Sequence, residues 1–166
     1  MSGSTTKKVL LDRFDRQTLR GFLHPLTGFQ AEGVELLAPD GSLALIPYPQ
    51  IKILSYVRDL EGTSALADRR HFLARPKAAG LWVRFHFRDG DAMEGVLPND
   101  LLLLAGPGFA FTPPDAARNA QRVFVPRDAL DALTVLGVVG SPLRGRRGAE
   151  RAGEPRQFRL FTEQTG

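Results

Sequence analysis

One pattern of alternating residues occurs twice in this chain, and it limits the folds that the chain can adopt. In residues 83–88 apolar and polar side chains alternate strictly, which is typical of a strand with one buried face. Asp89-Gly90 follows as a two-residue turn signal, because glycine adopts positive φ without steric cost. Residues 92–97 then supply a return strand. The segment therefore predicts a β-hairpin.

Residues 9–23 align with residues 83–97 without a gap. The matched pairs are Val9 with Val83, Asp15 with Asp89, Gly21 with Gly95, and Leu23 with Leu97. Downstream, Ile46-Pro47 followed by Ile51 corresponds to Val125-Pro126 followed by Leu130. The ordered series indicates two diverged copies of one small β unit. Gly21 and Gly95 are expected where the second strand bends or another backbone comes close, and Pro47 and Pro126 where a strand ends.

This repeat predicts an all-β chain with four parts. They are a first unit over 1–57, a linker over 58–80, a second unit over 81–140, and a basic, largely disordered tail over 141–166. Each unit should contain five short strands. In the second unit the third strand is expected to run from Leu101 to Leu104 and to continue at Phe109, and residues 66–73 of the linker allow one helical turn.

Composition separates the tail from the body. The chain has 22 basic and 18 acidic residues. Residues 141–166 contain six of the basic and three of the acidic residues. The other 16 basic and 15 acidic residues leave the body nearly neutral. The chain has no cysteine and no apolar run long enough for a membrane span. It has no metal-ligand spacing and no nucleophile motif. We therefore expect a cytoplasmic, non-catalytic protein that needs no cofactor or metal and does not associate with membranes.

The order of these elements resembles the Sm-like fold, and within it the bacterial Hfq branch. The resemblance depends on Asp15, Gly21, Phe29, Ile46-Pro47 and Ile51 in the first unit. It implies two five-stranded, strongly bent β-barrels in tandem. Because neighbouring Hfq subunits pair their fourth and fifth strands, it also implies that the two units pair with each other. It further implies that whole chains form homo-oligomers by strand pairing.

The same resemblance implies binding of RNA. Phe29 corresponds to the base-stacking loop residue of Hfq. At the strand corner, where Hfq has a Tyr-Lys-His run, the histidine is missing in both units and Arg127 is the one cation. Basic residues beside an exposed aromatic ring can also hold phosphates and stack a base. In the linker such residues are Arg69, Arg70, Phe72 and Arg75. The alternative for the linker is a solvated segment whose Phe72 plugs one end of a barrel.

The tail carries a second candidate site. Gln157, Phe158, Leu160 and Phe161 resemble the short peptide motif by which bacterial proteins dock on the DNA polymerase sliding clamp. Alternatives are a different protein partner, or packing of these residues on the chain's own barrel. The sequence thus favours a binding module for RNA or another nucleic acid, with a protein-interaction adaptor as the alternative.

Overall fold

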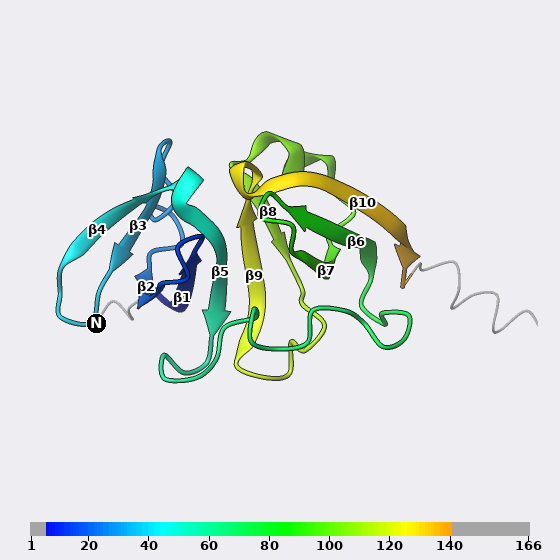
Figure 1. Cartoon of the computed structure of the whole chain (residues 1–166), viewed down its shortest axis with the longest axis horizontal. Coiled ribbons are helices and arrows are strands. Elements are labelled where there is room, and N and C mark those ends of the chain that lie inside the picture. Colours follow the sequence, from blue (N-terminus) through cyan, green and yellow to red (C-terminus); the bar gives the residue numbers. More distant parts are fainter. Residues whose placement is uncertain (1–5, 141–166) are drawn as a thin grey trace, which may run out of the picture.

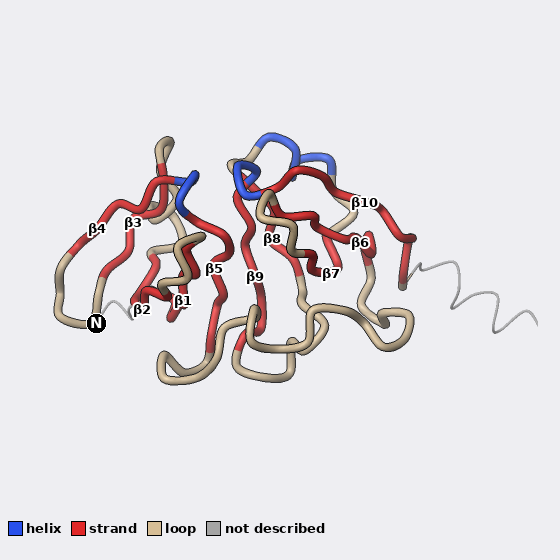
Figure 2. The backbone as a smooth tube through the Cα atoms, viewed as in Figure 1, coloured by secondary structure: helices blue, strands red, loops and turns tan. Residues whose placement is uncertain are grey.

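The computed structural model describes residues 6–140, which form ten β-strands and three short 3₁₀ turns. The strands of the first unit are β1 (Lys7–Arg13), β2 (Thr18–Leu23), β3 (Gly33–Leu37), β4 (Leu43–Pro47) and β5 (Ile51–Val57). Those of the second are β6 (Gly80–Phe87), β7 (Ala92–Leu97), β8 (Gly108–Phe111), β9 (Ala120–Pro126) and β10 (Leu130–Val139). The 3₁₀ turns η1 (Tyr48–Gln50), η2 (Leu101–Ala105) and η3 (Arg127–Ala129) lie along the upper edge of the molecule in Figure 2.

The two units share one pairing scheme. Val9 pairs with Gly21 and Val83 with Gly95, so the two hairpins have the same register. Gly33 pairs with Pro47 and Gly108 with Pro126, so the third and fourth strands also match. In each unit the fifth strand pairs with the first. The duplication inferred from the sequence therefore extends to strand order and register.

The hydrogen-bonded sheets differ from the predicted pair of barrels. One sheet has seven strands in the order β4-β3-β2-β1-β5-β9-β8, and the other has three in the order β10-β6-β7. Neither sheet closes on itself, and β7 contacts β8 through the single bridge between Val96 and Thr112. The all-β class is confirmed, whereas the continuous sheet through β5 and β9 joins the two units into one body (Figure 1).

Two further local predictions are wrong. Residues Leu101–Ala105 form η2 rather than a strand, and Asp100 caps this turn because its carboxylate accepts a hydrogen bond from the Leu102 N–H. The linker forms no helical turn over 66–73 and instead runs as irregular backbone beside β7. It is anchored there by Glu94, whose carboxylate accepts hydrogen bonds from the Phe72 N–H and from Arg84.

Gly21 and Gly95, the equivalent glycines of the two units, lie where close packing leaves no room for a side chain. A Cβ atom on Gly21 would lie 2.5 Å from the Leu37 carbonyl oxygen, and one on Gly95 would lie 2.2 Å from the Phe111 ring. Backbone approaches one glycine and a ring approaches the other. Pro47 and Pro126 end β4 and β9, as expected for residues that cannot donate a ladder hydrogen bond.

Arg16 occupies the turn position that corresponds to Gly90, and its φ of 70° is in the left-handed region. Replacing it with glycine should raise the free energy of unfolding by about 0.5–1 kcal/mol, because glycine adopts this conformation without the Cβ penalty. Urea unfolding measures the change. The control is Arg16→Ala, which removes the side chain but keeps the strain, and equal stabilisation by both variants would refute the backbone explanation.

Candidate functional site at the joint between the two units

Strands β5 and β9 form the internal joint, the antiparallel ladder that links the first unit to the second. Leu54 lies opposite Phe124, Ser55 opposite Val123, and Tyr56 opposite Arg122. The fifth strand of one unit thus pairs with the fourth strand of the other, which confirms the expected pairing between units. Because the ladder satisfies backbone groups on both strands, the joint is a continuation of the sheet rather than a contact between side chains alone.

Apolar side chains cross this joint in both directions. Phe124 from β9 is only 5% exposed and belongs to the core of the first unit, where its ring lies 4.6 Å from that of Phe29. Leu10 and Ile53 of the first unit belong to the core of the second. Each core therefore contains side chains from both units, and separating the units would expose both cores.

Lys52 is the buried cation of the joint. Its side chain is 8% exposed, and its ammonium group lies 2.5 Å from a carboxylate oxygen of Asp89 and 2.5 Å from one of Asp91. The ammonium also lies 5.2 Å from the centre of the Phe87 ring. The two carboxylates belong to the β6–β7 turn, so the hairpin that dominates the sequence pattern holds a cation from the other unit. Arg70 adds a second contact to Asp91 at 3.3 Å.

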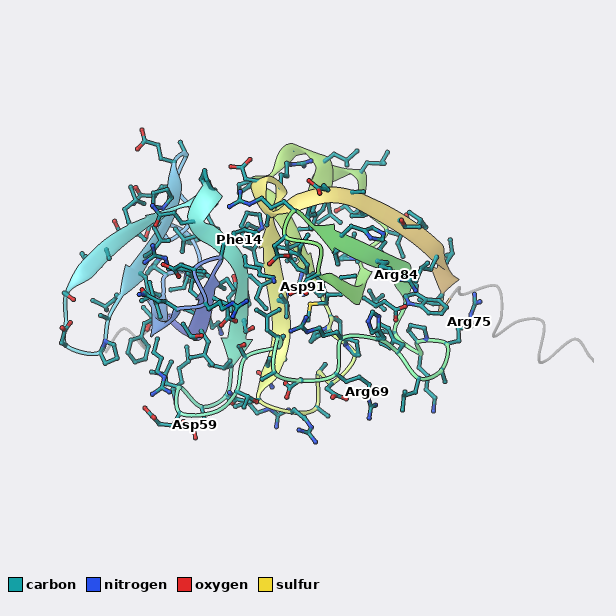
Figure 3. The ribbon with its side chains drawn as sticks, in the orientation of Figure 1. Phe14, Asp59, Arg69, Arg75, Arg84 and Asp91 are labelled. Carbon is teal, nitrogen blue, oxygen red and sulfur yellow. The ribbon has the colours of Figure 1, made fainter. Side chains whose placement is uncertain are left out.

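A cleft of about 540 Å³ lies beside this ion-pair cluster. Its lining residues are Asp12, Arg13, Phe14, Arg16, Lys52, Leu66, Arg70, Asp89 and Asp91. The lining lacks histidine, serine and cysteine, and most of its charged groups are paired with one another. Lys52, Arg70, Asp89 and Asp91 thus form an ion-pair network across the joint. Figure 3 shows Phe14 and Asp91 in this central region between the units.

The Asp91 carboxyl group should make stability depend on pH. Its pKa is lowered, chiefly by the hydrogen bond from Lys52. A carboxyl group with a lower pKa in the folded state stabilises the fold above its unfolded value of about 3.9, and this contribution is lost as the pH falls through and below that value. The urea midpoint of Asp91→Asn should therefore be lower than that of the wild type at pH 7, and the gap should close towards pH 3.

The control for that measurement is Glu32→Gln. Glu32 is exposed, and no ion pair or hydrogen bond of its side chain occurs in the described residues. A gap that stays constant from pH 7 to pH 3 in Asp91→Asn would show that the variant acts through packing and not through charge.

β4 and β10 are the counterparts of β9 and β5, the two strands of the internal joint. Each of them has one edge without a strand partner within residues 6–140. Within residues 6–140, β4 pairs only with β3, and β10 pairs only with β6. Both carry exposed apolar side chains, which are Leu43 (65%), Leu45 (44%), Val135 (56%) and Val138 (52%). Figure 1 shows β4 and β10 on opposite sides of the chain. Edge strands with exposed apolar side chains are available for pairing with another strand.

Each predicted RNA-contacting residue of the first unit and corner has a partner within the chain. Phe29 packs against Phe124. The guanidinium group of Arg127 donates hydrogen bonds to the carbonyl oxygens of Gly106 (2.8 Å), Leu103 (3.1 Å) and Leu104. Arg127 thus fixes the end of η2 instead of standing free at the corner.

The linker residues are also engaged. Arg69 lies 3.6 Å from the Asp115 carboxylate, and the Phe72 ring meets Trp82 edge-on at 6.3 Å. Arg75 donates a hydrogen bond to the Val138 carbonyl at 2.6 Å. Figure 3 shows Arg69 near the lower edge and Arg75 at the right-hand end, so these two cations lie apart. Gln157, Phe158, Leu160 and Phe161 lie outside the described residues.

The sequence interpretation missed Lys52 and Phe124. A signal for Lys52 was present, since it is the one charged residue in the otherwise apolar run from Ile51 to Leu54. Phe124 offered none, because strand periodicity does not reveal which unit's core a side chain enters. Among residues 6–140, no group of three or more metal-ligating side chains is placed to hold an ion, and no helix has the length and apolarity of a membrane span.

A family model described as a family of unknown function (DUF6982) matches residues 5–137. The match spans both units and the internal joint, so the chain belongs to this family. No curated protein and no solved structure matches the chain.

Proposed function

We propose that this protein is a non-catalytic, Sm-like binding module that assembles head to tail with further copies of itself, through β10 of one chain and β4 of the next. One observation carries the proposal. The chain joins its own two units by pairing a fifth strand with a fourth strand, and within residues 6–140 the other fifth and fourth strands, β10 and β4, each have one unpaired edge. Such a heterologous contact produces a ring where the rotation closes and a filament where it does not.

The internal joint supplies a register for the pairing. Pro47 and Pro126 end equivalent strands, so Leu45 corresponds to Phe124, and Leu43 to Arg122. Ile51 and Leu130 begin the fifth strands, so Leu133 corresponds to Leu54. The register of the internal joint then places Leu133 opposite Leu45 of the next chain, Thr134 opposite Ala44, and Val135 opposite Leu43.

Exposure and packing agree with this register. Leu43, Leu45 and Val135 are all exposed, although apolar side chains are otherwise buried in most strands of the molecule. Leu133 packs against the core of its own unit, as Leu54 does in the first unit. Pairing would bury the exposed side chains and satisfy two rows of backbone groups at once.

The contact between chains should be weaker than the internal joint. Asp131 occupies the position in β10 that Lys52 occupies in β5, and Asp15 occupies the position of Asp89. The ion pairs that hold the internal joint are therefore replaced by two carboxylates of like charge. We expect assembly that depends on protein concentration and strengthens as salt screens this repulsion.

RNA binding and clamp docking have less support than assembly. Phe29, Arg127 and the linker residues already have partners within the chain, so a nucleic acid would have to displace them or bind elsewhere. The clamp-like peptide lies outside the described residues. Both remain predictions from the sequence.

Cysteine cross-linking tests the register directly, because the chain contains no natural cysteine. A double variant with Ala44→Cys and Thr134→Cys should form disulfide-linked multimers on oxidation, since residues directly opposite in a ladder have Cα atoms about 4.5–5.5 Å apart. The control pairs Thr134→Cys with Ser42→Cys, which is two residues out of register. Sedimentation of the wild type over a range of concentrations completes the test, and a monomer throughout, without specific cross-links, would overturn the proposal.

A further inference from the structure

The turn η2 carries three leucines that no other part of residues 6–140 covers. Leu101 is 82% exposed, Leu102 79% and Leu104 62%. Together they form the leucine ledge, which lies above β8 on the edge of the molecule that holds all three 3₁₀ turns (Figure 2). Exposed leucines are common singly, but three within four residues make a compact apolar surface.

The ledge is held rigidly at both ends. At its start, the Asp100 carboxylate accepts a hydrogen bond from the Leu102 N–H at 2.9 Å. At its end, Arg127 donates to the carbonyl oxygens of Leu103, Leu104 and Gly106, and its guanidinium carbon lies 4.8 Å from the centre of the Phe109 ring. A fixed apolar surface loses little conformational entropy when another surface binds to it.

The first unit shows what the equivalent loop does. Phe29 lies in the loop between β2 and β3, four residues before Gly33, and it packs across the internal joint onto Phe124. Leu104 lies in the loop between β7 and β8, four residues before Gly108. Gly33 and Gly108 occupy the same ladder position, since each is opposite the proline that ends the next strand. Leu104 is therefore the counterpart of Phe29.

We infer that the leucine ledge covers the contact between chains by packing on Leu45 of the next copy. Leu45 is the counterpart of Phe124, because each lies two residues before its strand-ending proline. It is 44% exposed in the single chain, whereas Phe124 is 5% exposed beneath Phe29. The occupant of the ledge is thus a second copy of this chain, and the inference rests on the proposed assembly.

The test compares Leu104→Asp with Leu73→Asp by sedimentation and by the Ala44-to-Thr134 cross-link. Leu73 is 82% exposed and lies in the linker, so it matches Leu104 in chemistry and accessibility but not in position. Leu104→Asp should weaken assembly by about tenfold or more, as the loss of a central apolar contact does. Leu73→Asp should leave assembly unchanged, and circular dichroism checks that both variants fold.

A variant with a tighter contact between chains provides a second test. Combining Leu104→Phe with Leu45→Phe would reproduce the Phe29–Phe124 contact between chains, and assembly should tighten relative to the wild type. If the wild type assembles and both Leu104 variants behave like it, the ledge has no role and the strand-pairing proposal stands. If the wild type stays monomeric at all concentrations, the proposed assembly fails and the ledge inference fails with it.

Discussion

Replacing Gly95 with alanine is expected to lower the free energy of unfolding by about 2 kcal/mol, and valine should lower it by more than about 3 kcal/mol. The added Cβ would lie 2.2 Å from a ring carbon of Phe111. Phe111 is 1% exposed, and its ring centre lies 4.5 Å from that of Phe85, so the ring has no space into which it can move. Thermal unfolding and solubility of the purified variants measure the effect.

The matched control is Gly137→Ala. Gly137 also lies in a strand, but nothing lies within 4 Å of the position that its Cβ would take. Its replacement should change stability by no more than about 0.5 kcal/mol. A double variant, Gly95→Ala with Phe111→Leu, should recover part of the loss, because a smaller side chain relieves the overlap. Equal losses at Gly95 and Gly137 would show that the clash is not the cause.

Gly95 also illustrates what the sequence reveals and what it does not. The match between the two hairpins predicted that this glycine is structural, and the register of both units agrees with that prediction. The contact that requires it could not be predicted, because the sequence does not indicate that Phe111 packs over this glycine. Periodicity identifies the face of a strand but not the side chain that packs on it.

The strand boundaries were predictable for a related reason. β5 begins and ends where the apolar run does, and Pro47 and Pro126 mark the ends of two strands. The error at Leu101–Ala105 arose because four consecutive leucines resemble a buried strand. What decides that segment is tertiary, since Arg127 reaches back over more than twenty residues to hold the turn. No local pattern contains that interaction.

The candidate site was predictable in outline only. The Sm-like resemblance led to pairing between a fifth and a fourth strand, which the internal joint contains. The residues predicted to contact RNA were not predictable in this way, because they have partners within the chain. Arg70, for example, is basic and lies beside an aromatic residue, but its charge is directed at Asp91. Whether a cation faces solvent or a carboxylate is set by the packing of segments that are far apart in sequence.

Replacing Lys52 with alanine is expected to lower the free energy of unfolding by about 3 kcal/mol. The side chains of Asp89 and Asp91 are 37% and 45% exposed, so they can regain water when the cation is removed. The ion pairs themselves should therefore contribute only on the order of 1 kcal/mol. The remainder comes from the buried alkyl stem, which packs near Phe87 and leaves a cavity when it is truncated.

Lys52→Met separates these two contributions, because methionine retains most of the stem but removes the charge. We expect it to lose about 1 kcal/mol at pH 7 and to approach the wild type towards pH 3, because protonation of Asp91, whose pKa is lowered by Lys52, removes its attraction to the cation. Lys77→Met, at an exposed lysine with no partner in the described residues, should be neutral at both pH values. If Lys52→Met were as damaging as Lys52→Ala, the charge would dominate the joint. At the contact between chains, Asp131 stands at the position that Lys52 has in the internal joint. The absence of a cation there would then weaken assembly far more than the apolar register alone implies.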